Sequence, residues 1–262
     1  MTNPVMSVAT VDRGVLEVKV KEMYRQVAEN PHGEFHFEMG RAMAERLGYA
    51  AADLDRIPPD AIDSFAGVGY FFHLAALQPG ERVVDLGSGS GMDTFVAALK
   101  VGATGQVTGI DMTDAQLEKA ARLARDGGFA QISYRKGYIE STGLPDGSVD
   151  CVISNGVINL APDKMRVFQE TARLLRSGGR LAIADIVADV VLPETVVCNP
   201  DLWAACIGGA AQRDQYREAI ELAGLRVERV EENTGYQFIS DRAKRATAKF
   251  GVKSVSMLAR KP

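Results

Sequence analysis

The clearest chemistry in this chain lies in a glycine-rich turn and two aspartates. Residues 83–91 read Val-Val-Asp-Leu-Gly-Ser-Gly-Ser-Gly, so an apolar run passes through Asp85 directly into a Gly-x-Gly-x-Gly turn. Glycine permits positive φ and lets a ligand approach the backbone closely. A helix is predicted from about Met92, and its free N–H groups would face the same crevice. The pattern therefore predicts a small-molecule site at the carboxyl end of this strand.

The two aspartates narrow the choice of ligand. The glycine spacing is tighter than the dinucleotide fingerprint G-x-G-x-x-G, and Asp85 would repel a pyrophosphate but attract an ammonium or sulfonium group. Asp111 ends the next predicted strand, where a carboxylate can accept hydrogen bonds from two ribose hydroxyls. These residues favour a nucleoside with a cationic tail and no phosphate, a description that S-adenosylmethionine fits. The alternative is a tight turn flanked by two solvated acids.

The elements that must position these residues alternate between strand and helix from about residue 80. Apolar runs predict strands at 82–86, 105–111, 132–138, 149–155, 180–187, 225–230 and 254–259, with antiparallel pairing open for the last. Helices are predicted between them, one opened by a capping box at Thr113-Asp-Ala-Gln116. The alternation predicts an α/β fold with a Rossmann-like, doubly wound sheet and helices on both faces.

Residues 1–75 break this alternation. Helix-like stretches at 16–29 and 35–47 predict a helical N-terminal cap over 1–75, followed by the ligand-binding domain over 76–262. Residues 188–212 are long for a connection and are predicted to form an insert that belongs to the cap. We expect the cap to close over the carboxyl ends of strands one and four, and to be mobile without ligand because few contacts tie it to the sheet.

Composition excludes several other functions. The 262 residues carry a formal net charge of −4, which argues against nucleic acid as a partner. No apolar run approaches the roughly 18 residues of a membrane span, and the first residues lack a basic start followed by an apolar block. Three cysteines without a CxxC pair suit a reducing compartment. We therefore expect a cytoplasmic protein whose partner is a small molecule.

The segments around the glycine turn resemble class I S-adenosylmethionine-dependent methyltransferases, and most closely the arsenite methyltransferase family. The matching segments are Val84–Asp93 (VDLGSGSGMD), Gly109–Thr113 (GIDMT), Val152–Leu160 (VISNGVINL), Pro162–Lys164 (PDK), Leu181–Ile186 (LAIADI) and Cys206–Gly209 (CIGG). They cover about half of the chain. The resemblance implies S-adenosylmethionine as the cofactor and a seven-stranded sheet whose last strand is antiparallel.

The resemblance also implies a role for individual residues in cofactor binding. Asp85 and the turn residues Gly87, Ser88 and Gly89 would hold the methionine end, and Asp111 the ribose. Tyr24 matches an N-terminal tyrosine that closes over the cofactor in that family. The remaining cofactor residues are Met112 and Gln116 beside the adenosine, Tyr138, Ile139 and Glu140 near the adenine, and Asn155 and Val157 next to the sulfonium.

The sequence departs from the arsenite methyltransferase family at the arsenic-binding cysteines. That family typically holds trivalent arsenic with three converging thiolates, since arsenic is soft and thiophilic. The cysteine that follows Ser-Asn on strand four is Gly156 here, the segment 64–73 contains none, and Cys206 alone matches. Cys198 is close enough in sequence to leave a paired site with Cys206 open. Cys151, inside a predicted strand, is interpreted as a small buried hydrophobe.

Aromatic residues and histidines stand where the cysteines are missing, which favours an organic acceptor. The candidate substrate-binding residues are Tyr70, Phe72, Asn159, Trp203 and Cys206. His36 and His73 are candidate general bases for a hydroxyl acceptor. The alternative for the aromatic residues is the core of the cap, and for each histidine a structural role.

The sequence thus predicts a methyltransferase that acts on an oxygen or nitrogen atom of a small organic molecule, for example a natural-product intermediate, without a metal. Two alternatives stay open. One is an arsenite methyltransferase that uses Cys206 with Cys198. The other is a cofactor-binding protein without transfer activity, since fold alone does not prove activity.

Overall fold

A single mixed sheet forms the centre of the computed structural model, which describes residues 12–199, 203 and 207–262. Its strands follow the order β3-β2-β1-β4-β5-β8-β7, and β6 pairs with β5 beside this path. The strands are β1 (Arg82–Leu86), β2 (Gln106–Asp111), β3 (Ile132–Lys136), β4 (Val149–Asn155), β5 (Leu175–Ala188), β6 (Ala211–Gln212), β7 (Arg226–Glu232) and β8 (Lys253–Arg260).

The strand pairing confirms the Rossmann-like prediction. β1 lies at the centre and pairs in parallel with β2 and β4, while β8 enters antiparallel between β5 and β7. Asp85 is opposite Gly109 on β2 and Ile153 on β4. The prediction of seven strands omitted β6, a two-residue strand parallel to β5. It forms where the insert returns along the end of β5, and two residues carry no apolar pattern that a sequence could show.

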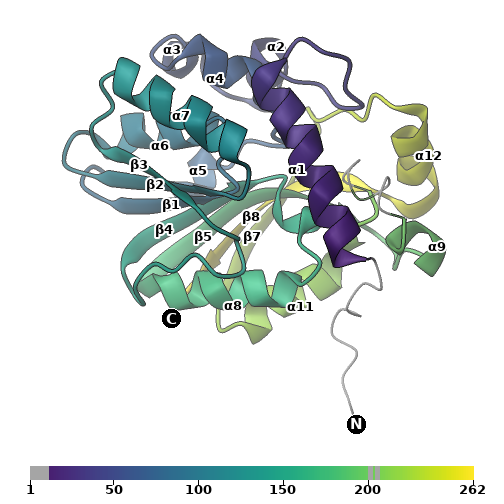
Figure 1. Cartoon of the computed structure of the whole chain (residues 1–262). Helices are drawn as coiled ribbons and strands as arrows, with labels where there is room; N and C mark the ends of the chain where they lie inside the picture. Colours follow the sequence, from purple (N-terminus) through teal and green to yellow (C-terminus); the bar gives the residue numbers. More distant parts are fainter. Residues whose placement is uncertain (1–11, 200–202, 204–206) are drawn as a thin grey trace.

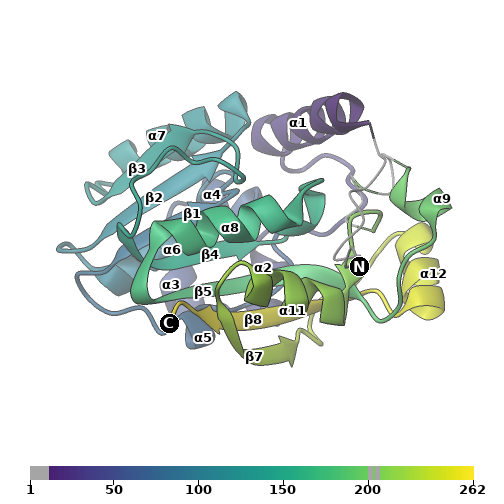
Figure 2. The same cartoon turned by 90° about the horizontal axis from the view of Figure 1, so that it is seen from below.

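Helices cover both faces of the sheet, as Figures 1 and 2 show. On one face Phe95 of α6 packs in the same apolar cluster as Ile153 of β4. On the other face Phe168 and Tyr216 pack with Ile183 of β5. This division follows from the alternation of side chains along each strand. The helices of this domain are α6 (Met92–Val101), α7 (Asp114–Asp126), the 3₁₀ turn η1 (Ile158–Leu160), α8 (Lys164–Leu174), α11 (Arg213–Leu222) and α12 (Asp241–Phe250).

Residues 12–75, the described part of the N-terminal region, form five helices, but most of this part is not a loose cap. The helices are α1 (Arg13–Glu29), α2 (Arg41–Leu47), α3 (Ala51–Leu54), α4 (Pro59–Asp63) and α5 (Phe72–Ala75). α5 contacts β5 and β8, and Tyr49 and Phe71 are buried in the same cluster as β4. Residues 49–75 therefore belong to the core of the sheet domain, contrary to the expected sparse contacts. α1 is the outer element and lies beside α7 (Figure 1).

Two further segments differ from the predicted boundaries. The helix expected over 35–47 begins only at Arg41, because Gly40 adopts a φ of 85° outside the helical region. The insert contains α9 (Glu194–Val197), which lies near α12 toward the start of α1 (Figures 1 and 2). Across the described ranges, we find no helix with the length and apolar character of a membrane span.

Candidate functional site

A crevice opens at the carboxyl ends of β1, β2 and β4. It consists of a cavity of about 400 Å³ and a smaller one of about 60 Å³, and both are lined by Tyr24, Gly87, Gly89 and Val157. The other predicted cofactor residues also line one of the two: Asp111, Met112, Tyr138, Ile139 and Glu140 the larger, and Asp85, Ser88, Gln116 and Asn155 the smaller. The structure thus brings together all the residues that the sequence assigned to the cofactor.

The glycine turn forms the floor shared by the two cavities. The backbone N–H groups of Gly87 and Ser88 donate to the carbonyl of Ile110, at 2.8 and 3.0 Å, and so fasten the turn to β2. Gly87 has a φ of 72°, and a Cβ atom at this position would lie 2.4 Å from Val157. Both the conformation and the close approach require glycine. The turn therefore leaves a cradle that a side chain would fill.

Asp111 is held at the edge of the larger cavity. Its carboxylate accepts hydrogen bonds from the backbone N–H groups of Gly89, at 3.0 Å, and Thr113, at 2.8 Å. Burial raises the pKa of Asp111, against these hydrogen bonds. A carboxylate oriented in this way at a strand end suits a ribose diol, and it links the glycine turn to the start of α7.

Two buried carboxylates lie together at the smaller cavity. Asp85 is 2% exposed and accepts a hydrogen bond from Thr94 at 2.6 Å. Asp93, which follows the glycine turn and carries no predicted role, accepts from the Tyr49 hydroxyl and the Asn155 amide. Burial and the charge of Asp93 raise the pKa of Asp85, and burial raises that of Asp93. In the described part of the chain, the side chains that hydrogen-bond these two carboxylates are hydroxyls and an amide rather than cations. Buried negative charge without a cation is costly, so this site suits a ligand with an ammonium group.

Asn155 joins the crevice to the segment that precedes α5. Its Oδ1 accepts from the N–H of Val68 at 2.7 Å, and its Nδ2 donates to the carbonyl of Gly69 at 3.0 Å and to Asp93 at 2.9 Å. The amide of Asn155, a residue that the resemblance places next to the sulfonium, is therefore engaged by the protein itself. Asn155 lines the smaller cavity, and its amide holds the segment that precedes α5 in place.

Gln116 connects the glycine turn to α1. Its Oε1 accepts from the Ser90 hydroxyl at 2.5 Å, and its Nε2 donates to the carbonyl of Tyr24 at 2.8 Å. The predicted capping box is wrong, because Thr113 makes no side-chain capping bond and Gln116 is used elsewhere. On the opposite side of the cavity, the Tyr138 hydroxyl donates to Glu17 of α1 at 2.7 Å. α1 is thus tied to Gln116 and to Tyr138, and the closing role of Tyr24 stays a prediction.

Three residues assigned to catalysis or substrate binding lie elsewhere. His73 Nε2 is 2.6 Å from Glu231 on β7, and its ring stacks on Tyr70 with centroids 5.6 Å apart. Tyr70 packs against Tyr49, and Phe72 is 3% exposed within the core. Phe72 and His73 lie on α5, which packs against β5 and β8, and Tyr70 directly precedes it. None of the three lines either cavity of the crevice. These assignments to the site are therefore corrected, and the alternative of a structural core is favoured.

His36 stands closer to the crevice. Its ring packs edge-on against Phe37, with centroids 4.7 Å apart, and Phe37 stacks with Tyr24 at 6.4 Å. One aromatic ring therefore separates His36 from a residue that lines both cavities. Its role as a base stays a prediction.

Of the remaining substrate candidates, Trp203 and Cys206 belong to the insert, and Asn159 lies in η1. Trp203 is buried, its indole N–H donates to the carbonyl of Val197, and it lines a cavity of about 100 Å³ that shares Pro162 and Asp163 with the larger cavity. Asn159 is fully buried, and neither of its amide atoms has a hydrogen-bond partner in the described part of the chain. Cys206 lies outside the described residues.

The residues of the crevice fit S-adenosylmethionine. A glycine cradle, a carboxylate for a ribose diol and a buried pair of acids without a cation match a nucleoside that carries an ammonium and a sulfonium. Asp85 would hold the amino group and Asp111 the ribose hydroxyls.

Comparison with known proteins identifies the family. Residues 77–224 match a methyltransferase domain. An arsenite methyltransferase of Halobacterium salinarum is 42% identical over 199 residues, which are 76% of this chain and 51% of the relative. The crystal structure of an arsenic (III) S-adenosylmethionine methyltransferase from Chlamydomonas reinhardtii superposes with a TM-score of 0.63 and 34% identity, covering 85% of this chain and 74% of that one. The aklanonic acid methyltransferase of a Streptomyces species is 37% identical over 108 residues, 41% of this chain and 49% of the relative.

The chain spans about half the length of the curated arsenite methyltransferases that it matches. The family match nevertheless covers the glycine turn, both strand-end aspartates, η1 and α8. The chain therefore belongs to the class I S-adenosylmethionine-dependent methyltransferases and is close to the arsenite methyltransferases.

Proposed function

We propose that this protein transfers a methyl group from S-adenosylmethionine to an oxygen or nitrogen atom of a small organic molecule. The observation that carries the proposal is the contact between Val68 and Gly156. A Cβ atom on Gly156 would lie 3.1 Å from a Val68 methyl group. The two regions in which the arsenite family has cysteines thus meet, but here they present a valine and a glycine.

The described cysteines support the same choice. Cys151 is fully buried in β4, and burial raises the pKa of its thiol to about 12, so it stays protonated at neutral pH. Cys198 follows α9 in the insert. The apolar contact between Val68 and Gly156 takes the place of thiolates, and such a surface suits an organic acceptor better than trivalent arsenic, which is soft and prefers sulfur ligands.

The chain's own residues would orient the reactants and exclude water. Bound S-adenosylmethionine supplies a methyl group activated by a sulfonium. Leu16 and Val20 of α1 line the larger cavity and would shield it from solvent. Asp85 and Asp111 fix the two ends of the cofactor, so that an acceptor atom can attack the methyl carbon in line with the breaking bond. His36 would accept the proton of a hydroxyl acceptor; an amine would need only to bind in its neutral form.

An activity assay tests this proposal. The purified protein with S-adenosylmethionine should methylate members of a panel of small phenols and amines, detected as S-adenosylhomocysteine and as a product heavier by one methylene. With arsenite and a thiol reductant, turnover should be poor.

The arsenite alternative has support of its own, because the relatives named arsenite methyltransferases match at 42–45% identity. Efficient methylation of arsenite that is lost in both Cys198→Ser and Cys206→Ser would overturn the organic acceptor and establish this alternative.

A further inference from the structure

The adenine side of the larger cavity is formed by a segment without regular structure. Residues 137–144, here called the wall segment, follow β3, and Gly137 to Ser141 line the cavity. Its internal hydrogen bonds are short-range: the N–H of Ser141 donates to the carbonyl of Tyr138 at 3.1 Å, and the N–H of Leu144 donates to the Thr142 hydroxyl at 3.3 Å. Such a segment keeps its shape only if its two ends are fixed from outside.

The first end is fixed to the ribose site. The N–H of Gly137 donates to the backbone carbonyl of Asp111 at 3.0 Å. Asp111 therefore fixes this end through its backbone carbonyl and holds the glycine turn through its side chain.

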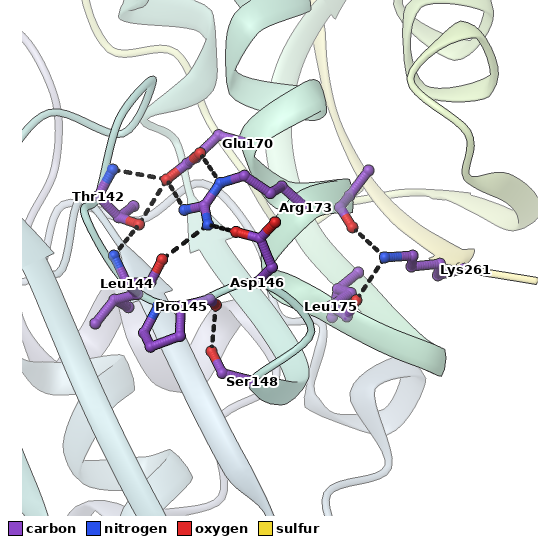
Figure 3. Close-up of polar contacts among 10 residues, drawn as sticks. Thr142, Leu144, Pro145, Asp146, Ser148, Glu170, Arg173, Leu175 and Lys261 are labelled. Atoms are coloured by element: carbon purple, nitrogen blue, oxygen red, sulfur yellow. Dashed lines mark hydrogen bonds and ion pairs between the residues drawn. The ribbon is translucent and has the colours of Figure 1, made fainter.

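The second end is fixed to α8 by one carboxylate, as Figure 3 shows. Glu170 is 9% exposed, and one of its oxygens accepts from the backbone N–H of Thr142 at 2.7 Å and from the Thr142 hydroxyl at 2.6 Å. Arg173 holds this carboxylate with two bonds of 2.8 Å, donates to the carbonyl of Leu144 at 2.8 Å and pairs with Asp146. Two charged side chains from adjacent turns of α8 thus hold the end of the wall segment.

The Glu170 carboxylate, which anchors the wall segment to α8, is ionised at neutral pH. Burial by itself would raise the pKa of Glu170, but hydrogen bonds from Arg173 and Thr142 outweigh it and lower the pKa to about 2. An ionised, bidentate pair is directional and strong, so the anchor is rigid as well as charged.

We propose that Glu170 is a positioning residue for the cofactor: through Thr142 it sets the place of the wall segment against the adenine. The proposal rests on the proposed function, since it takes the larger cavity as the adenosine site. Glu170 touches no ligand in this scheme. It acts on affinity for any ligand that carries adenosine, whatever stands at the methionine end.

Figure 3 also supplies a matched control. Lys261 donates to the backbone carbonyls of Ala172 and Leu175, both at 2.7 Å, at the end of the same helix. Its hydrogen bonds support α8 but do not reach the wall segment. A Lys261→Met variant should therefore lower the melting temperature without moving the adenine wall.

The experiment compares two ligands by titration calorimetry, at a temperature at which every variant is folded. S-adenosylhomocysteine carries both adenosine and an amino acid, whereas methylthioadenosine lacks the amino acid. Glu170→Ala should weaken both ligands by the same factor, about tenfold, which corresponds to losing one charge-assisted hydrogen bond. Asp85→Asn should weaken S-adenosylhomocysteine only, and Lys261→Met should leave both within about twofold.

Glu170→Asp provides a rescue arm, because a shortened carboxylate retains the charge and should restore part of the affinity. Unchanged ligand affinity in Glu170→Ala would overturn the positioning role. So would a loss of affinity in Lys261→Met equal to that in Glu170→Ala, when the melting temperature falls by the same amount in both variants. Failure of the unmodified protein to bind S-adenosylhomocysteine would instead contradict the cofactor site itself.

Discussion

The side-chain amide of Gln116 donates a hydrogen bond to the backbone carbonyl of Tyr24, 2.8 Å away, across 92 positions of sequence. The same side chain accepts from Ser90 in the glycine turn. The helix α1, which lines the crevice, and the glycine turn are therefore joined through one buried residue.

Replacing Gln116 should loosen α1. Gln116→Leu preserves the volume but removes both hydrogen bonds and leaves the Tyr24 carbonyl without this donor, at a cost of about 1–3 kcal/mol. Affinity for S-adenosylhomocysteine should fall several-fold, and amide exchange around Tyr24 should accelerate. Hydrogen exchange with and without the ligand measures both, with Glu118→Gln on the same helix as the control. Unchanged protection at Tyr24 would show that other contacts suffice to hold α1.

Asp111→Ala should lower cofactor affinity at least tenfold. The variant loses the proposed ribose contacts, worth about 1.5–3 kcal/mol each for a charged acceptor, and also the bonds that hold Gly89 and Thr113. Titration with S-adenosylmethionine is the measurement. Asp114→Ala removes an exposed carboxylate, paired with Lys136 at 2.7 Å, and should bind as the unmodified protein does. Equal affinity of the two variants would exclude Asp111 from the ribose site.

Cofactor affinity should rise with pH because of Asp85. Burial and the Asp93 carboxylate raise the pKa of Asp85 above its ordinary value of about 3.9. The pKa of Asp85 is therefore higher in the folded protein than in the unfolded chain, so the folded protein without ligand binds more protons. Its stability falls as the pH rises from the unfolded pKa to the folded pKa. A ligand with an ammonium group requires the ionised carboxylate of Asp85, so the affinity for such a ligand rises over the same pH interval.

Calorimetry with S-adenosylhomocysteine from about pH 5 to 7.5 tests this linkage. Asp85→Asn should flatten the profile. Methylthioadenosine, which lacks the ammonium group, should show a weaker pH dependence in the unmodified protein, because only its ribose contact with Asp111, whose pKa burial also raises, remains. Affinity for S-adenosylhomocysteine that is constant or falls as pH rises would contradict the assignment of Asp85 to the amino group.

The two histidines should behave differently once an acceptor with a hydroxyl is found. His36→Ala should lower turnover by about a hundredfold or more while cofactor affinity stays nearly intact. His73→Ala should leave turnover unchanged, because His73 pairs with Glu231 and stacks on Tyr70 away from the crevice. Steady-state rates on the two variants decide this. If neither change affects turnover, the acceptor needs no histidine base.

Removal of the Asn155 amide should destabilise the whole domain. Asn155→Leu leaves the Val68 N–H without its partner and removes one donor each from the Gly69 carbonyl and from Asp93. Buried groups left unsatisfied cost about 1–3 kcal/mol each, so we expect a loss of several kcal/mol in the free energy of unfolding. Urea denaturation measures it. A loss below about 1 kcal/mol would mean that the segment before α5 is held mainly by packing.

The sequence alone was sufficient for the strands that carry the site. β1 and β4 have the predicted bounds, because short apolar runs ended by Gly or Asn are local signals. The glycine turn and Asp111 were found for the same reason: each lies at the end of such a run, and parallel strands bring their ends to one edge. The resemblance added the residues of the wall segment, which carry no pattern of their own.

Tertiary structure alone decided which side chains face the crevice. His73, Tyr70 and Phe72 were assigned to the site, but Phe72 and His73 lie on α5, which packs against β5 and β8, and Tyr70 precedes this helix and stacks on His73. Asn155 and Gln116, assigned to the cofactor, line the smaller cavity, and their amides also bind Val68, 87 positions away, and Tyr24, 92 positions away. Local periodicity determines which elements form, whereas such pairings depend on how distant elements satisfy each other's buried polar groups and volumes. That balance is settled only when the whole chain packs.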